Sequence, residues 1–405
     1  MTGKTKIEWT DDTWNPIVGC SIVSKGCTNC YAMGQAARVD ACQLGKGHYA
    51  GLTKRVKGKA VWTGKVAQAP EKARLAPLRA TKPRLYFVNS MGDPFDSAVP
   101  DAWVDEMFAV MALSPHHTFQ VLTKRPDRMR EYLGGPFKGD GVCARIAEHI
   151  SKFDETPGLL RPNLYNPRVY TKSPIGPMKD GVPEFGYRYF MTPGRWPLPN
   201  VWLGTSIEDQ VSADQRIPDL LATPAALRFI SAEPLLGPVD LESSWHGESA
   251  LYSECWGDCG WCENGHPKLE NCRKLTNPDE GGITGLDWVI AGGESGPNAR
   301  PCHPDWIRAL RDQCAAADVP YFFKQWGEWA LGSQPSKSGE RRCVYNDGRS
   351  VPDTMDAVSD EDLKGRHKSF AATVMTKTGK KKSGHLLDGV EHRAFPQTTT
   401  GDSNE

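Results

Sequence analysis

Six short apolar runs recur along the chain, and each ends in small, polar or charged residues. The runs lie at 85–93, 119–125, 201–209, 227–234, 287–295 and 320–326. Nearly continuous apolar runs of about four to eight residues are typical of parallel strands covered on both faces. Segments 100–113 and 303–317 place apolar residues at helical spacing after a start with Pro and Asp, which predicts helices. The alternation predicts an α/β fold, either a βα-repeat barrel or a doubly wound sheet.

The strand ends share hydroxyl, amide and charged side chains. They are Asn89, Ser90, Asp93, Thr123, Lys124, Thr205, Ser206, Glu208, Ser231, Glu233, Glu294, Ser295, Lys324 and Gln325. In such folds the chemistry collects at the carboxyl ends of the strands. One strand must end in polar residues where it meets water, but the same pattern at six ends predicts a polar cleft on one face.

Composition excludes few functions. A chain of 405 residues with 39% hydrophobic residues can bury a large core. Lys plus Arg (49) balances Asp plus Glu (49), so no overall basic field indicates a nucleic-acid partner. No run approaches the roughly 18 apolar residues of a membrane span, and residues 1–9 lack the apolar core of a signal peptide. We therefore expect a cytoplasmic protein without a membrane partner, and among its 12 cysteines the clustered ones are interpreted first as metal ligands or redox groups.

Two segments interrupt the repeat. Residues 137–200 are rich in Pro, Gly, Tyr and Arg without clear periodicity, and residues 241–284 are rich in Cys, Gly, Asn and Pro. Both are interpreted as loop insertions into a barrel domain over 1–334. The polar segment 335–405, with a basic run at 377–383, is predicted to be a partly disordered extension.

The first cysteine cluster, Cys20, Cys27 and Cys30, has the spacing C-x6-C-x2-C and follows a candidate strand at 6–9. Three thiolates would hold a [4Fe–4S] cluster with one iron left open for a small molecule. Two alternatives remain at this point. One is a zinc site completed by Cys42 or a distant His, and the other is three unligated thiols.

The second cluster lies in the later insertion and has four members. They are Cys255, Cys259, Cys262 and Cys272, with the spacing C-x3-C-x2-C-x9-C. Four ligands on a short Gly- and Asn-rich loop favour a closed site, either structural zinc or an auxiliary iron–sulfur cluster.

Short motifs spread along nearly the whole chain outside the two insertions carry a family resemblance. They are 14–16, Cys20, Cys27 and Cys30 with 31–32, 89–95, 122–126, 202–206, 231–235, 291–296, 323–327 and 386–389. With them the sequence resembles the phage-derived three-Cys-motif family of uncharacterised phage and prophage proteins, which is similar to radical S-adenosylmethionine enzymes. The usual spacing of that superfamily is C-x3-C-x2-C, whereas the first gap here is six residues.

The resemblance implies a partial (β/α) TIM-like barrel of the radical S-adenosylmethionine type, with the [4Fe–4S] cluster on its first loop. S-adenosylmethionine would bind the open iron and would be cleaved by an electron from a donor such as flavodoxin or ferredoxin. Its amino acid part would meet Asn89, Ser90, Met91, Gly92 and Asp93. The expected contacts with the remaining cofactor or the substrate are Lys124, Ser206, Glu208, Ser231, Glu233 and Glu294.

The phage setting and relatives that repair or modify nucleic acid make a nucleobase, nucleotide or nucleic acid the expected substrate. One rival hypothesis is a zinc-stabilised nucleic-acid-binding protein without catalysis, based on the second cysteine cluster and the run at 377–383. Another is a hydrolase that uses Glu233 or Glu294.

Overall fold

The structure is a computed structural model of the chain. It describes residues 2–5, 7–134, 140–154, 170–174, 178–179, 182–183, 187–191, 196–242, 249–251, 254–255, 282–283, 285–331, 340–353 and 372–397. None of the helices in these ranges is long and apolar enough to cross a membrane. The chain divides into two compact units: unit 1 comprises Met1–Thr205 and Asp219–Arg228, and unit 2 comprises Ser206–Pro218 and Phe229–Glu405.

Unit 1 contains a parallel arrangement of strands that the apolar runs predict. The strands pair in the order β2 (Asp12–Trp14), β7 (Leu85–Val88), β8 (Thr118–Thr123) and β13 (Val201–Ser206), and β1 (Thr2–Lys4) joins β2 antiparallel. All six residues of β13 are buried, as expected for a strand covered on both faces. Tyr86 and Phe119 stack across β7 and β8 with 5.6 Å between ring centroids.

Helices connect these strands. They are α2 (Glu71–Arg74), α3 (Ala76–Arg79), α4 (Asp101–Ala112), α5 (Pro126–Gly134) and α6 (Asp140–Asp154). The helix predicted at 100–113 is confirmed as α4, which begins directly after Pro100. It packs against α3 and α6. Helix α6 lies inside the segment 137–200, where the sequence analysis identified no periodic element.

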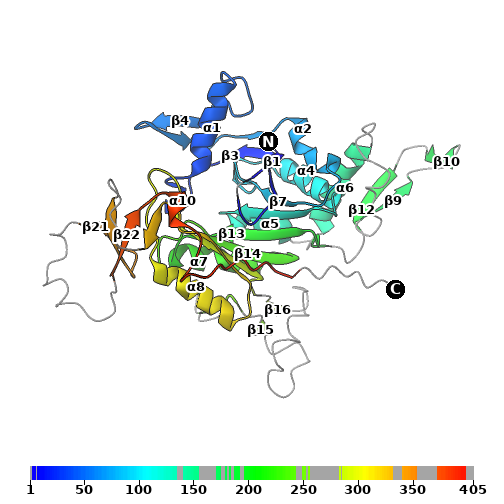
Figure 1. The fold of residues 1–405 in the computed structure, drawn as a ribbon. Coiled ribbons are helices and arrows are strands. Elements are labelled where there is room, and N and C mark those ends of the chain that lie inside the picture. Colours follow the sequence, from blue (N-terminus) through cyan, green and yellow to red (C-terminus); the bar gives the residue numbers. More distant parts are fainter. Residues whose placement is uncertain are drawn as a thin grey trace, which may run out of the picture. The chain divides into compact units, whose positions relative to one another are not determined.

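The remaining strands of unit 1 are short. In 137–200 they are β9 (Tyr170–Pro174), β10 (Met178–Lys179), β11 (Val182–Pro183) and β12 (Tyr187–Met191), which pair as the hairpins β9–β12 and β10–β11. Between β2 and α2 lie β3 (Ile17–Gly19), η1 (Lys25–Cys27), α1 (Tyr31–Cys42), β4 (Thr53–Val56), β5 (Lys59–Trp62) and β6 (Val66–Gln68). Figure 1 shows α1 beside the β4–β5 hairpin, against which it packs.

Unit 2 contains a second set of parallel strands. They pair in the order β14 (Leu227–Ala232), β17 (Trp288–Gly292) and β18 (Tyr321–Gln325). All residues of β14 and β17 are buried. Two helices, α7 (Gln210–Leu221) and α8 (Pro304–Ala316), belong to the same alternation. The helix predicted at 303–317 is confirmed as α8, whose first turn is capped by His303 because its side chain accepts the N–H of Asp305.

Most of the other elements of unit 2 follow β18. Strands β19 (Trp329–Leu331), β20 (Arg341–Tyr345), β21 (Ser350–Pro352) and β22 (Ala372–Lys377) form an antiparallel sheet, and α10 (Lys380–Ser383) follows. A short pair, β15 (Glu254–Cys255) and β16 (Gly282–Ile283), lies in the later insertion. The structure therefore confirms a mixed α/β fold with parallel strands; the predicted domain boundaries stay a prediction.

Candidate functional site

The three cysteines of the first cluster lie on one connection of unit 1. Cys20 follows β3, Cys27 ends η1 and Cys30 directly precedes α1. Cys27 is buried, whereas Cys20 and Cys30 are half-buried. The connection between β3 and α1 thus delivers three sulfur atoms from a segment of eleven residues.

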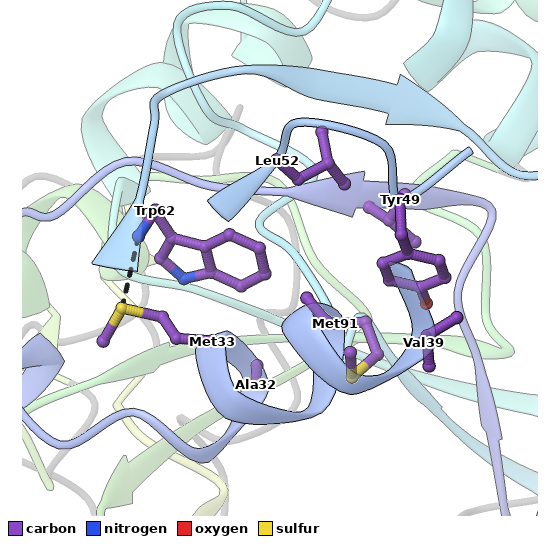
Figure 2. Packing of buried hydrophobic residues seen from close by; sticks show 9 residues of the cluster. Ala32, Met33, Val39, Tyr49, Leu52, Trp62 and Met91 are labelled. Carbon is purple, nitrogen blue, oxygen red and sulfur yellow. Dashed lines mark hydrogen bonds between the residues drawn. The ribbon is translucent and has the colours of Figure 1, made fainter. Parts of the chain in front are cut away.

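An apolar cluster supports this connection. Figure 2 shows Met33 of α1 near Trp62 of β5, whose backbone N–H donates to the Met33 sulfur at 3.4 Å. The cluster comprises Val18, Ala32, Met33, Ala36, Val39, Tyr49, Leu52, Trp62 and Met91. The side chains of Cys20 and Cys30 pack against it. Because Met91 lies just beyond β7, the cluster ties the cysteine connection to the segment predicted to bind a cofactor.

Two glycines bring the same parts together through the backbone. The N–H of Gly19 donates to the carbonyl of Met91 at 3.0 Å, and Gly19 forms a bridge with Gly92. Gly19 has a φ of 91°, and a Cβ there would lie 2.3 Å from the carbonyl oxygen of Lys65. A Cβ on Gly92 would lie 2.8 Å from the Gly19 oxygen. Only glycine fits this approach of chain to chain.

A charged network lies beside Cys20. The Nη1 of Arg125 lies 3.8 Å from the Cys20 sulfur and 2.8 Å from Asp93 Oδ2. Its Nη2 lies 2.8 Å from Asp96 Oδ2 and donates to the Ser21 hydroxyl at 2.6 Å. All three charged side chains are largely buried, so this guanidinium is held in place by two carboxylates while it contacts the sulfur.

Asp93, expected to meet a cofactor, is already surrounded by protein donors. Its Oδ1 accepts the Thr123 hydroxyl at 2.7 Å and the Phe95 N–H at 3.0 Å. Its Oδ2 accepts the Lys124 N–H at 3.1 Å in addition to Arg125. The carboxylate therefore organises the strand ends and has little capacity left for a ligand.

The thiols beside this network are hard to ionise in the metal-free protein. Burial, with the charge of Asp93 as a smaller contribution, raises the pKa of Cys20 to about 12, while Arg125 acts in the opposite direction. Burial also raises the pKa of Cys30, and the charge of Lys124 opposes that increase. Because metals bind thiolates, any metal group held by these cysteines would release protons as it binds.

Asn89, one of the predicted cofactor residues, carries a buried side-chain amide. It follows β7 directly and is 5% exposed. In the part of the chain that the structure describes, neither its Oδ1 nor its Nδ2 forms a hydrogen bond. Buried amides are normally satisfied, so such an orphan indicates a missing partner.

The neighbours of Asn89 are positioned by a residue to which the sequence analysis assigned no role. The Oδ1 of Asn15 accepts the Met91 N–H at 2.9 Å and the Ser90 hydroxyl at 3.1 Å. Asn15 and Arg125 both lie in motifs that carry the family resemblance, at 14–16 and 122–126, and that was the only available signal for either.

Within the described ranges, no three or more His, Cys, Asp or Glu side chains are grouped so that they could hold a metal ion. The [4Fe–4S] cluster and the zinc site expected at Cys20, Cys27 and Cys30 both stay predictions.

The predicted residues of unit 2 fall into three pairs of charges. Glu208 is 1% exposed and contacts Arg216 at 2.7 Å, while Arg216 also donates to the Ser206 carbonyl at 2.7 Å. Glu294 binds Arg300 with both oxygens, at 2.6 and 2.8 Å.

The third pair joins β14 to β18. Glu233 contacts Lys324 Nζ at 2.8 Å through each oxygen. Ser231, by contrast, is buried in β14, and its carbonyl accepts the Ile207 N–H at 3.0 Å.

The second cysteine cluster lies outside the described residues, apart from the backbone of Cys255. The backbone of Cys255 lies in β15, but its side chain and the residues Cys259, Cys262 and Cys272 lie outside the described residues. The closed metal site predicted there stays a prediction.

Comparison with known proteins gives a family without an assigned activity. No curated protein and no solved structure matches the chain. One family model, described as "Protein of unknown function (DUF5131)", matches residues 4–396. This match covers nearly the whole chain, and the protein therefore belongs to the DUF5131 family.

Proposed function

We propose that the protein is an iron–sulfur, S-adenosylmethionine-dependent radical enzyme with a partial (β/α) barrel, acting on a nucleobase, nucleotide or nucleic acid. The observation that carries the proposal is the junction of the cysteine connection with the end of β7. Two of the three thiols pack against the same apolar cluster as Met91. Two residues before Met91 lies the buried, unpartnered amide of Asn89. A metal cluster held by the cysteines and a cofactor that binds the Asn89 amide would therefore meet at the end of β7.

In this proposal Cys20, Cys27 and Cys30 hold a [4Fe–4S] cluster with one open iron. When bound, the cluster would supply the electron that cleaves S-adenosylmethionine reductively and starts radical chemistry. The amide of Asn89 can donate to a carboxylate and accept from an ammonium group, so it suits the amino acid part of that cofactor. Asp93 keeps Arg125 against Cys20 rather than binding ligand.

Arg125 has a defined task at this site. The thiolate of Cys20 would be formed in a place where burial disfavours negative charge. The guanidinium, 3.8 Å from the sulfur, offsets part of that charge. Arg125 is therefore a counter-charge for one proposed ligand, Cys20, and the charge of Lys124 acts in the same direction on Cys30.

The decisive experiment is anaerobic reconstitution of the full-length protein with iron and sulfide. We expect absorbance at about 400 nm and loss of that absorbance in the Cys27→Ala variant. Cys42→Ala is the matched control, because Cys42 is exposed and lies at the far end of α1. To separate any second metal group, iron and sulfide are also measured in a variant with Cys255, Cys259, Cys262 and Cys272 replaced together.

The outcomes discriminate between the hypotheses. Iron and sulfide lost on mutation of Cys27 but not of Cys42 support the proposal. Stoichiometric zinc without sulfide, together with salt-sensitive nucleic-acid binding, would instead support the zinc-stabilised binding protein. Activity that persists with all cysteines replaced would point to the hydrolase. The proposal also requires a donor such as flavodoxin or ferredoxin and a reducing cytoplasm, in a bacterial or phage-infected cell.

A further inference from the structure

We propose that unit 2 binds the neutral lactam edge of a nucleobase, as in uracil, thymine or guanine, through Glu233, Lys324, Gln325 and Ser295. This inference rests on the proposed function for the substrate class and names the residues that would recognise it. All four residues lie at the carboxyl ends of the adjacent parallel strands β14, β17 and β18. Ligands of parallel α/β folds bind at these ends.

A β-bulge brings two consecutive side chains to one place. Phe323 pairs with Ala291 and Gln325 pairs with Gly292, so Lys324 is skipped by the ladder between β17 and β18. Consecutive residues of a regular strand point to opposite faces. Here Lys324 Nζ lies 2.8 Å from Glu233, and Gln325 Nε2 lies 3.5 Å from the same carboxylate. Bulges re-aim side chains in this way next to functional sites.

A close backbone approach at Gly293 supports the arrangement. A Cβ on Gly293 would lie 2.1 Å from the Trp326 carbonyl oxygen, and the Gly293 N–H donates to the Gln325 carbonyl at 2.8 Å. The close approach of these backbones holds the end of β18 in register with Glu233. Gly292 imposes no such limit, because a Cβ there would lie at an ordinary contact distance of 3.5 Å from the Glu233 carboxyl carbon.

The group retains unused donors and acceptors. Lys324 directs two N–H groups at the two oxygens of Glu233 and keeps a third. Gln325 Nε2 donates to the Ser295 hydroxyl oxygen at 2.9 Å. Gln325 is 3% exposed, yet its Oε1 has no hydrogen-bond partner among the residues that are described. A reversed amide would place that oxygen 3.5 Å from the Glu233 carboxylate, where two acceptors repel each other.

The charges select a neutral ligand. Glu233 and Lys324 compensate each other at 2.8 Å, so the pair adds no net charge that would favour phosphate or a cation. Their side chains retain 19% and 12% exposure, which leaves one edge accessible. At that edge a carboxylate acceptor lies directly beside an ammonium donor. A lactam presents the complementary pair, an N–H donor next to a carbonyl acceptor.

The test measures the binding of free nucleosides to the full-length protein by ligand-observed NMR titration. We expect uridine or guanosine to bind and 3-methyluridine and 1-methylguanosine to bind roughly tenfold to a hundredfold more weakly, because methylation removes the N–H that Glu233 accepts. Equal binding of the methylated compounds, tighter binding of adenosine, or no binding of any nucleoside would overturn the inference. These comparisons use the unchanged protein, so they do not depend on a variant that folds.

Protein variants then locate the site. The charge-balanced double variant E233Q/K324M should lose binding by a similar factor, since both partners are replaced and neither charge is left buried alone. The double variant R308M/D388N removes an exposed ion pair of the same unit and should bind as the unchanged protein does. Equal affinity in E233Q/K324M and R308M/D388N would refute the assignment of the four residues.

The outcome is separable from that of the proposed function. Nucleoside binding and iron and sulfide content are measured separately on the same unchanged protein, because the four residues lie in unit 2 and the three cysteines lie in unit 1. Lactam-specific binding in a protein without iron and sulfide would support the inference and refute the radical mechanism. An intact iron–sulfur cluster without lactam-specific binding would support the proposed function and refute the inference about unit 2.

Discussion

The Nη1 of Arg125 lies 3.8 Å from the Sγ of Cys20, and the same guanidinium is fixed by Asp93 and Asp96. Hydrogen bonds and positive charge near a ligand sulfur stabilise the more negative, reduced state of an iron–sulfur cluster. We therefore expect Arg125→Gln to lower the midpoint potential of the reconstituted cluster. Redox titration followed by electron paramagnetic resonance measures this shift.

Arg130→Gln is the control for that experiment. Arg130 lies on α5, which begins directly after Arg125, but is exposed and contacts Asp219 instead of the cysteine connection. A potential that is the same in Arg125→Gln, Arg130→Gln and the unchanged protein, with iron retained, would mean that Arg125 only supports the fold.

Gly19 offers a test of the backbone junction. In Gly19→Ala the new Cβ would meet the Lys65 carbonyl oxygen at 2.3 Å, and the φ of 91° would also be strained. Gly64→Ala has a φ of 83° but open space around its Cβ. Both changes should lower the free energy of unfolding in urea, Gly64→Ala by about 1 kcal/mol and Gly19→Ala by more. Equal losses would show that the contact with Lys65 contributes nothing.

A variant of Glu208 tests whether this carboxylate supports the fold or binds a ligand. It is 1% exposed and contacts Arg216, itself 6% exposed, at 2.7 Å. Because removing one partner leaves a buried charge unpaired, we expect Glu208→Gln to cost about 3–5 kcal/mol of unfolding free energy. The double variant E208Q/R216M should cost less than the sum of both single changes. Full stability of Glu208→Gln combined with lost cofactor binding would contradict this assignment.

His117 predicts a pH dependence of stability. Burial, assisted by the charge of His116, lowers the pKa of His117 to about 4, compared with about 6.5 in an unfolded chain. Between these two pKa values the unfolded chain binds a proton that the folded chain does not bind. The stability that the neutral His117 contributes is therefore complete above about pH 6.5 and is lost as the pH falls toward 4. His117→Gln should flatten this part of the profile of melting temperature against pH. His385→Gln, at an exposed site, should leave it unchanged.

Local patterns predicted the elements but not the contacts between them. The apolar runs of β13, β14 and β17 identify buried parallel strands because both faces of such strands are covered. Helix α6 was missed because it lies in a segment otherwise rich in Pro and Gly. The contact between Cys20 and Arg125 joins residues 105 positions apart. Local periodicity in the sequence cannot predict a contact between residues so far apart along the chain.

The strand ends illustrate the same limit. Lys324 and Gln325 were recognised as polar residues at the end of a strand, which regular alternation would place on opposite faces. Their common contact with Glu233 depends on the skipped residue in the ladder, which is a property of strand pairing rather than of composition. Likewise, no sequence feature distinguishes Glu233 from Glu208 and Glu294, which differ in the arginine or lysine that each meets.

The apolar cluster behind the cysteine connection also sets how the metal-free protein meets oxidants. Cys20 and Cys30 both pack against this cluster, which includes residues of α1 and Trp62 of β5, so we expect one local opening to uncover both thiols together. Amide hydrogen exchange of α1 and the β4–β5 hairpin should then share one opening free energy. Alkylation of the two thiols should follow the same opening equilibrium, and strengthening the contact between Met33 and Trp62 would slow both.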